Sequence, residues 1–279
     1  MFSWLRRVSL REATGPVRLN HGPTAPEWLY FGIMRIPTLL ACAASLAAAN
    51  DTTFTPAFRG SAYDTERNAA AYLEEHREGF VAGKHVCTRT EFLGSGGQPI
   101  ALRTLDFGRF GCKPDYVYRD LRNGYEEGAA VSPVQGAAEI RVHYRDSAKA
   151  PVKEKRIKVP EPCVINGGIG EFVRGRWDEI AAGKKVAFNM VIPARLDYFR
   201  FEAYLDRGYS LAPGEAKGRN YLPVVIEPKS AVLSMLLPAI VLFEDVATKR
   251  LIRYQGIVNV ADAKGRSLRV RTDYPGLGP

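Results

Sequence analysis

The stretch KVAFNMVIPARLDYFRFEAYL, residues 185–205, decides the fold class. In each half of it hydrophobic side chains occupy every second position: Val186, Phe188, Met190 and Ile192, then Phe199, Phe201, Ala203 and Leu205. A period of two is typical of a β-strand that buries one face. Two such runs joined by a short turn predict a pair of antiparallel strands.

The same alternation recurs along most of the chain. In residues 139–145, Ile140, Val142 and Tyr144 share one face, and polar or charged residues occupy the other. Less regular runs lie at 59–64, 71–80, 84–93, 100–107, 116–125, 152–159, 221–227, 239–245, 250–258 and 266–273. Short glycine-containing turns join many of them, which favours an antiparallel meander. About a dozen strands are too many for one flat sheet, so we expect a mainly β fold with a strongly curled sheet or a closed or partly open β-barrel.

One segment has helical periodicity instead. Hydrophobic residues fall at i, i+3, i+4, i+8 and i+11, namely Ile169, Phe172, Val173, Trp177 and Ile180. This pattern predicts one amphipathic helix of about fourteen residues, ended by Gly183 and packed on the sheet. A shorter helix is expected at 230–236.

The first 49 residues are expected to lie outside the fold. From Met34 the chain reads MRIPTLLACAASLAAAN, a basic residue and an apolar run followed by small residues before Asn50, which is typical of a cleaved signal peptide. We interpret residues 1–33 as an upstream extension, with Met34 as the true start, and residues 50–279 as a single β-rich domain. Residues 28–49 could alternatively span a membrane as an uncleaved anchor, and Cys42 lies in a weak lipoprotein-like context. The sequence therefore predicts a periplasmic or secreted protein of a bacterial cell envelope, with peripheral envelope association left open.

Composition places the chain among ordinary globular proteins. Hydrophobic residues make up 46% and charged residues 25%, and the formal net charge is +9. A positive charge could favour anionic partners at long range, but we interpret it as a solvated surface whose net charge aids solubility. The basic strands do not interleave aromatic side chains on the same face, so we expect no nucleic-acid partner.

Three cysteines belong to the mature part: Cys87, Cys112 and Cys163. An oxidising compartment would allow two of them to pair. Cys112 and Cys163 both lie in turn-like contexts, FGCKPD and EPCVING, whereas Cys87 lies within a strand pattern. We therefore predict a Cys112–Cys163 disulfide, although the spacing does not exclude other pairings.

Three segments carry a resemblance to a known group of proteins. They are GYEEGA (124–129), FVRGRWDEIAAGKKVAFNMVIPARLDYFRFEAY (172–204) and TKRLIRYQGIVNVADAKGRSLRVRTDY (248–274). Together they resemble a family of exported, β-rich bacterial proteins of unknown function, over most of residues 58–274. The resemblance implies export and a β-rich architecture, and it supplies no activity and no site.

Motifs of common enzymes do not occur. There is no G-x-S-x-G elbow, no phosphate-binding loop and no G-x-G-x-x-G after a strand. His85 and Cys87 supply only two potential metal ligands, and adjacent carboxylates such as Glu74 and Glu75 point to opposite faces of a strand. We therefore expect no cofactor and no metal, find no catalytic residue, and favour a protein that is not an enzyme.

The best-motivated function is binding of an apolar or amphipathic, lipid-like molecule inside the curled sheet. The ligand-cavity candidates are Phe172, Trp177, Phe188, Met190, Phe199 and Phe201. A packed core without a ligand is the alternative use of these side chains. A periplasmic enzyme would require polar groups in the cavity, for which the candidates are Arg195, Asp197 and Tyr204. An integral outer-membrane β-barrel would require outward apolar bands with aromatic girdles.

Overall fold

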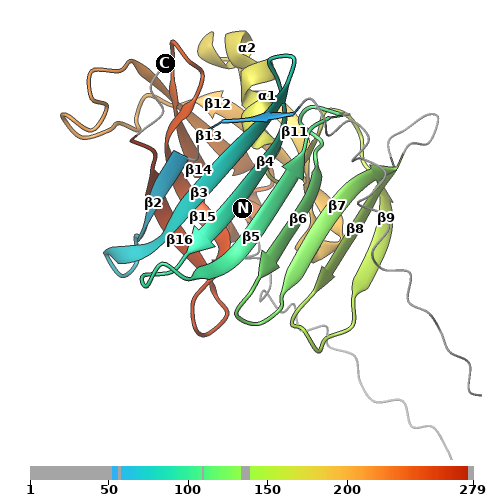
Figure 1. Ribbon diagram of the computed structural model, residues 1–279. Coiled ribbons are helices and arrows are strands. Elements are labelled where there is room, and N and C mark those ends of the chain that lie inside the picture. The colour runs from blue at the N-terminus through green and yellow to red at the C-terminus, as the bar shows by residue number, and fades with distance from the viewer. Residues whose placement is uncertain (1–51, 56–57, 109, 133–138, 276–279) are drawn as a thin grey trace, which may run out of the picture. The chain divides into compact units, whose positions relative to one another are not determined.

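The computed structural model describes residues 52–55, 58–108, 110–132 and 139–275 (Figure 1). The predicted signal peptide and upstream extension lie outside these residues. The strands are β1 (Thr53–Phe54), β2 (Phe58–Asp64), β3 (Ala69–Val81), β4 (Lys84–Leu93), β5 (Pro99–Asp106), β6 (Asp115–Asp120), β7 (Glu126–Ser132), β8 (Glu139–Arg145), β9 (Lys153–Lys158), β10 (Cys163–Ile165), β11 (Val186–Ile192), β12 (Asp197–Leu205), β13 (Tyr221–Pro228), β14 (Ile240–Asp245), β15 (Leu251–Ala261) and β16 (Ser267–Asp273). The helical segments are α1 (Ile169–Gly175), α2 (Trp177–Ala181), the 3-10 turn η3 (Pro193–Arg195) and α3 (Ala231–Leu236).

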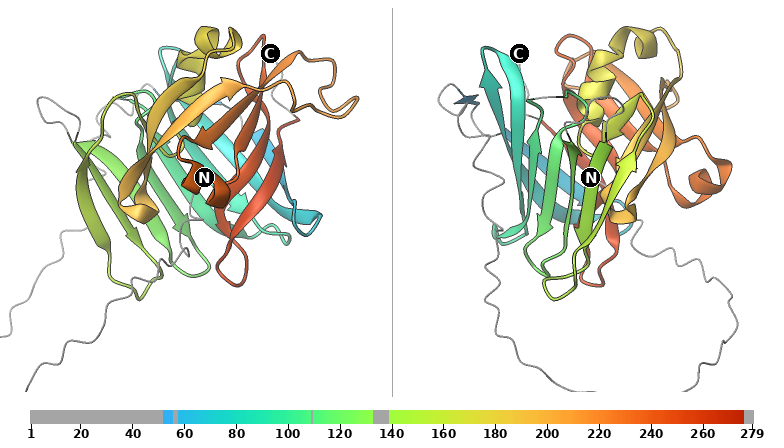
Figure 2. Two further views of the ribbon diagram at one scale, coloured as in Figure 1. Left: turned by 180° about the vertical axis from the view of Figure 1, so that it is seen from behind. Right: turned by 90° about the vertical axis from the view of Figure 1, so that its right-hand side faces the viewer.

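These strands belong to one curled sheet with the order β10-β11-β12-β13-β14-β15-β16-β2-β3-β4-β5-β6-β7-β8-β9. Strand β16 pairs with β2, with Thr272 opposite Ala62, so segments from the two ends of the fold lie side by side. The sheet does not close, because β10 and β9 end the path. Figure 2 shows β3–β9 forming one wall and β11–β15 the other. The prediction of a mainly β, strongly curled sheet is confirmed.

The prediction of antiparallel pairing is wrong at one place. Strands β10 and β11 are parallel, with Val164 opposite Met190. A parallel pair needs a crossover connection, and the segment that carries α1 and α2 supplies it. The single helix predicted here is in fact two short helices that meet at Arg176. The short helix expected at 230–236 is confirmed as α3, capped by the Ser230 hydroxyl.

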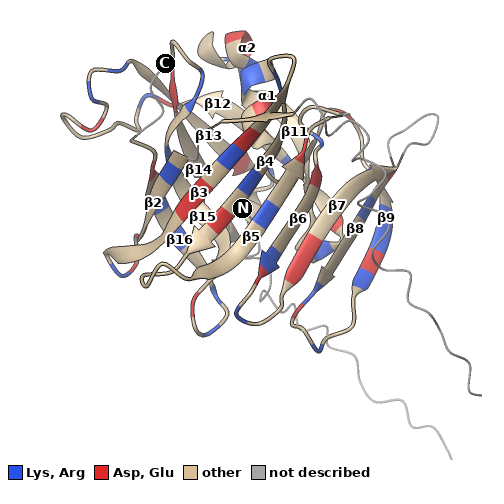
Figure 3. Cartoon of the chain, in the orientation of Figure 1, with Lys and Arg blue, Asp and Glu red and all other residues tan. Residues whose placement is uncertain are grey.

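The core fills the inside of the curl. Its largest buried side chains include Tyr116, Tyr118, Tyr254, Phe188 and Ile140. Lys, Arg, Asp and Glu residues occur along β3, β4 and β9, as Figure 3 shows. On the edge strand β9, Lys153, Lys155 and Lys158 are exposed, and such charges oppose edge-to-edge association. None of the helices within residues 52–275 has the length and apolarity needed to cross a membrane.

Candidate functional site

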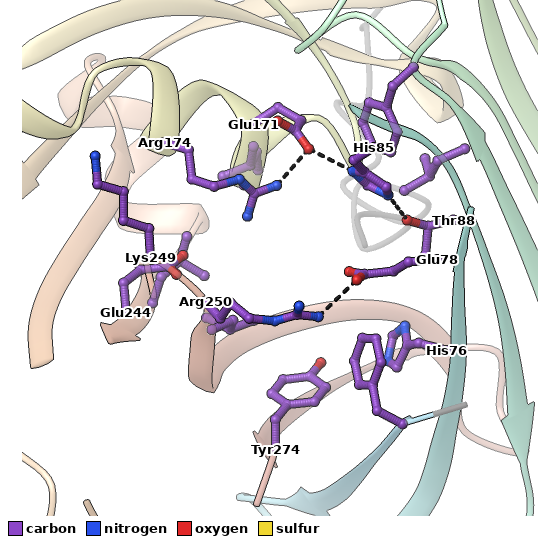
Figure 4. A pocket seen from close by; sticks show the side chains of 18 of the residues that line it. His76, Glu78, His85, Thr88, Glu171, Arg174, Glu244, Lys249, Arg250 and Tyr274 are labelled. Atoms are coloured by element: carbon purple, nitrogen blue, oxygen red, sulfur yellow. Dashed lines mark hydrogen bonds and ion pairs between the residues drawn. The ribbon is translucent and has the colours of Figure 1, made fainter. Parts of the chain in front are cut away.

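A cavity of about 390 Å³ lies where α1 faces the inner side of β3, β4 and β14 (Figure 4). This volume is in the range of small-molecule sites. The apolar lining residues are Phe58, Phe80, Leu105, Phe107, Ile169, Leu242 and Leu251. The polar lining residues are His76, Glu78, His85, Thr88, Arg103, Glu171, Arg174, Glu244, Thr248, Lys249, Arg250 and Tyr274, and Gly167 and Gly170 complete the wall. The cavity is therefore amphipathic, with charged groups beside aromatic and aliphatic ones.

Strand β3 brings polar groups into the curl. Its inner face carries Tyr72, Glu74 and His76, which alternate along the strand with more exposed residues. The same face continues into the cavity with Glu78 and Phe80. Side chains two apart on a strand share a face, so these acids and this histidine point inward together with the aromatic residues. A charged inner face is expensive unless its groups are hydrogen-bonded.

A buried hydrogen-bond network satisfies that requirement next to the cavity. The Glu74 carboxylate accepts from the Tyr274 hydroxyl at 2.8 Å and lies 2.8 Å from His76 Nε2. His76 Nδ1 lies 3.0 Å from the Thr90 hydroxyl, which accepts from Arg103 at 3.2 Å. Burial alone would raise the pKa of Glu74, but the hydrogen bond and charge of His76 outweigh burial and lower it. The network fixes three lining side chains, His76, Arg103 and Tyr274.

A β-bulge aims His85 into the cavity. Cys87 pairs with Gly79 and His85 pairs with Phe80, so Val86 is an extra residue in β4. Without it, His85 and Thr88, three residues apart, would point to opposite faces. With it, His85 Nε2 lies 2.9 Å from the Thr88 hydroxyl and 3.0 Å from the Cys87 carbonyl oxygen.

Helix α1 contributes the partner of His85. Glu171 Oε1 lies 2.9 Å from His85 Nδ1 and accepts from Arg174 at 2.6 Å (Figure 4). Burial alone would raise the pKa of Glu171, but the hydrogen bond to His85 and the charge of Arg174 lower it to about 2. Glu171 is therefore ionised at neutral pH and holds a histidine and an arginine at the cavity wall.

Glu244, on β14, is a buried carboxyl of a different kind. It is 2% exposed, and its Oε2 has no hydrogen-bond partner among the described residues. Burial raises its pKa to about 7, and the charge of Arg174 offsets this only in part. Thr248 Oγ1 and Arg103 Nε, also in the lining, have no hydrogen-bond partner in the described part of the chain either. Three buried polar atoms around one cavity thus have unused hydrogen-bonding capacity.

The basic side chains of the lining fall into two groups. Arg174 is paired with Glu171, and Arg250 is paired with Glu78 at 2.8 Å. Lys249 and Arg103 form no ion pair with any residue that the structure describes. Lys249 has a left-handed backbone (φ 53°), and its Nζ lies 5.6 Å from the centre of the Trp177 ring. Arg103 instead donates to Thr90, and its charge contributes to lowering the pKa of Glu74.

The six predicted apolar candidates lie together elsewhere in the core. Phe172 packs on Phe188 with ring centres 4.5 Å apart, and Phe188 packs on Phe201 at 6.0 Å. Trp177 and Met190 are buried in the same core, and Phe199 packs against it. None of the six lines the cavity described above. They attach the crossover helices to β11 and β12.

The three predicted polar candidates do not converge. Arg195 lies in η3, and Asp197 accepts from the backbone of Tyr198 at the start of β12. Tyr204 lies on the opposite face of that strand and donates to Glu227 at 3.0 Å. It packs against a small outer cluster that includes Phe243. None of the three lines the cavity.

Cys112 and Cys163 are neighbours, as the disulfide prediction requires. The Cys112 thiol lies 3.3 Å from the Cys163 carbonyl oxygen, and both cysteines are free thiols in the structure. The pairing itself stays a prediction.

Sequence reasoning missed the residues of the cavity. The available signal was the period of two in β3, which places Glu74, His76 and Glu78 on the same face as Tyr72 and Phe80. The approach of Glu171 to His85 could not be seen, because it needs both the bulge in β4 and the crossover to α1.

Comparisons with known proteins add little to this geometry. No protein-family model matches the chain, and no curated protein matches its sequence. Among solved structures, it is similar to a β-barrel-like protein of domain of unknown function DUF1849 from Brucella abortus. The identity is 10% and the TM-score is 0.41, over 80% of this chain and 97% of that chain. At this level the similarity says nothing about activity.

Proposed function

We propose that the chain binds an amphipathic molecule with an anionic head group in the 390 Å³ cavity. The observation that carries the proposal is the combination, in one cavity, of an apolar wall with two cations that have no ion-pair partner among the described residues, Lys249 and Arg103. The apolar part of the ligand would contact Phe58, Phe80 and Leu242, and its anion would approach the cations.

Both contributions are favourable on physical grounds. Removing apolar surface from water is worth about 25 cal/mol per Å², so a short hydrocarbon chain gains several kcal/mol of transfer free energy. An anion beside an unpaired cation gains more at a partly buried site than in water, because the effective dielectric constant is lower. The Thr248 hydroxyl, which has no hydrogen-bond partner in the described part of the chain, offers a hydrogen bond to the same head group.

Calorimetric titration of the delipidated protein with decanoate, decyl phosphate and decanol tests the proposal. We expect both anions to bind at least tenfold more tightly than the alcohol. Lys249→Gln is expected to weaken binding of the anions while leaving decanol unchanged, and Lys264→Gln, an exposed lysine in a turn, is the matched control. Failure of all three compounds to bind, or equal affinity for decanol and decanoate, would overturn the proposal.

We propose also that the protein is exported, on the support of the signal-like sequence 34–49. Mass spectrometry of the protein from the cell envelope is expected to give Asn50 as the first residue. An intact N-terminal segment on protein recovered from the cytosol would contradict export and would leave the cavity proposal unaffected.

One arrangement favours a second candidate function, hydrolysis of an ester. The His85 imidazole lies 2.9 Å from the Thr88 hydroxyl through Nε2 and 2.9 Å from Glu171 through Nδ1, and all three residues line the cavity. A hydroxyl, an imidazole and a carboxylate in this order can act as nucleophile, base and orienting group. Thr88 Oγ1 would attack the ester carbonyl and pass its proton to His85, which would protonate the departing alcohol. Water would then release the acyl group.

Labelling with a fluorophosphonate and hydrolysis of p-nitrophenyl octanoate test this second candidate. Both are expected to require Thr88 and His85, so Thr88→Val and His85→Gln should abolish them. Thr104→Val, at an exposed position of β5, is the matched control. Neither labelling nor turnover by the wild-type protein would contradict this second candidate function. His85 would then only connect Glu171 to the Cys87 carbonyl oxygen through hydrogen bonds.

A further inference from the structure

We propose that Glu244 makes the binding of an anionic head group depend on pH. Neutral Glu244 donates a hydrogen bond to the anion, and ionised Glu244 repels it. Binding would then be tight in mildly acidic conditions and weak in alkaline ones. This inference rests on the proposed binding function and assigns its pH dependence to one side chain.

The position of Glu244 in the sheet supports this role. It lies opposite Leu222 on β13 and opposite Leu251 on β15, so apolar side chains flank it on both sides. The register of β14 and β15 shifts between Phe243 and Glu244, as the register of β3 and β4 shifts next to His85. Such irregularities re-aim side chains. Here both of them occur at residues that line the same cavity.

The charges around Glu244 leave it without a dedicated partner. Arg174, on α1, is bonded to Glu171, and Arg250, after β14, is bonded to Glu78 on β3. Lys249 extends to Trp177. Glu244 is 2% exposed and its Oε2 has no hydrogen-bond partner among the described residues, and such burial favours the protonated form of a carboxyl. In agreement, burial raises the pKa of Glu244 to about 7.

A protonated carboxyl can donate one hydrogen bond, and an ionised one can only accept. The anionic ligand therefore meets a donor below neutral pH and a second negative charge above it. If only the protonated form binds, the dissociation constant scales inversely with the protonated fraction. Between pH 6 and pH 8 that fraction falls about tenfold for a group with a pKa near 7.

Two histidines also line the cavity, so their contribution to anion binding must be separated from that of Glu244. His76 is bonded to Glu74 and Thr90, and His85 faces Glu171. Replacing Glu244 alone distinguishes these contributions, because it leaves both histidines with their partners.

The test is a fluorescence titration with 11-(dansylamino)undecanoate, whose carboxylate is ionised throughout, at pH 6, 7 and 8. For the wild-type protein we expect the dissociation constant to rise about tenfold between pH 6 and pH 8. For Glu244→Gln we expect it to stay within twofold over this range. Glu154→Gln, an exposed acid on β9, is the matched control and should behave as wild type.

The outcomes separate this inference from the proposed function. Absence of binding by the wild-type protein even at pH 6 overturns both. Binding that does not depend on pH overturns the role of Glu244 alone. A pH dependence that persists undiminished in Glu244→Gln also overturns it. A melting curve of Glu244→Gln at pH 6 verifies that the variant is folded.

Discussion

Glu171 Oε1 lies 2.9 Å from His85 Nδ1, so a helix and a strand separated by 86 residues in sequence meet at the cavity wall. Arg174 completes the contact from the same helix. Helix α1 has seven residues, too few to be stable alone in water. Its position over the cavity therefore depends on this contact and on the buried Phe172 and Val173.

Glu171→Gln is expected to lower the free energy of unfolding by about 1–3 kcal/mol at pH 7, because two charge-assisted hydrogen bonds are weakened. Since its folded-state pKa is lowered to about 2, the contribution of Glu171 is present above its unfolded-state pKa of 4.5 and lost as the pH falls toward 2. Urea unfolding at pH 7 and pH 2.5 should show the difference between wild type and variant shrinking. Glu179→Gln, on the exposed side of α2, serves as control.

Glu244→Gln is expected to have the opposite pH dependence. The pKa of Glu244 is raised from 4.5 to about 7, so the unfolded state loses its proton first and the wild-type protein becomes less stable as the pH rises between these values. The full effect is about 3 kcal/mol. Thermal unfolding should show the variant to be more stable than wild type at pH 8 and similar to it at pH 4.5. Greater stability of the wild type at pH 8 would contradict the raised pKa.

A second buried carboxylate, Glu127, should be more sensitive to substitution. It accepts from Tyr116 at 2.6 Å, from Asn259 at 2.6 Å and from Tyr125. Glu127→Gln places an amide donor against these donors and is expected to cost about 2–4 kcal/mol of stability. Glu91→Gln, at an exposed position of β4, should cost less than 1 kcal/mol by comparison, since exposed charges contribute little. Chemical unfolding of both variants checks the contrast.

We expect Cys112 and Cys163 to form a disulfide during folding in an oxidising compartment. Burial raises the pKa of Cys163 to about 12, so little thiolate is available once the protein has folded. We expect non-reducing peptide mapping to find the bond in protein isolated from the envelope, and only slow oxidation of protein folded under reducing conditions. The bond would stabilise the fold by up to about 4 kcal/mol on the loop-entropy model. Rapid oxidation of the folded, reduced protein would contradict this account.

The sequence alone predicts most strands of the sheet, but it does not predict the residues of the candidate site. Alternation in 185–205 predicts β11 and β12 correctly, because burial on one face imposes a period of two. Arg176 interrupts the helix at a position where hydrophobic spacing predicts continuity, and the parallel pairing of β10 with β11 depends on the crossover that follows. Both are consequences of tertiary packing, which local periodicity does not record.

The cavity illustrates the same limit at the level of single residues. The large aromatic residues predicted to line a cavity pack on one another instead, since Phe172, Phe188 and Phe201 fill the space between α1 and the sheet. The lining of the cavity includes charged groups instead, among them Glu244, Arg174 and Arg250. The hydrophobic pattern thus predicts the residues of the core. Charged residues on the inner face of a strand would have predicted the candidate site better.

The pairing of Thr272 with Ala62 has a consequence for biosynthesis. As the chain leaves the ribosome, β2 and β3 are ready long before β16 exists, and the edge of β2 stays uncovered until translation is nearly complete. An exposed edge can pair with strands of other chains, so the edge of β2 is a site of aggregation until β16 covers it.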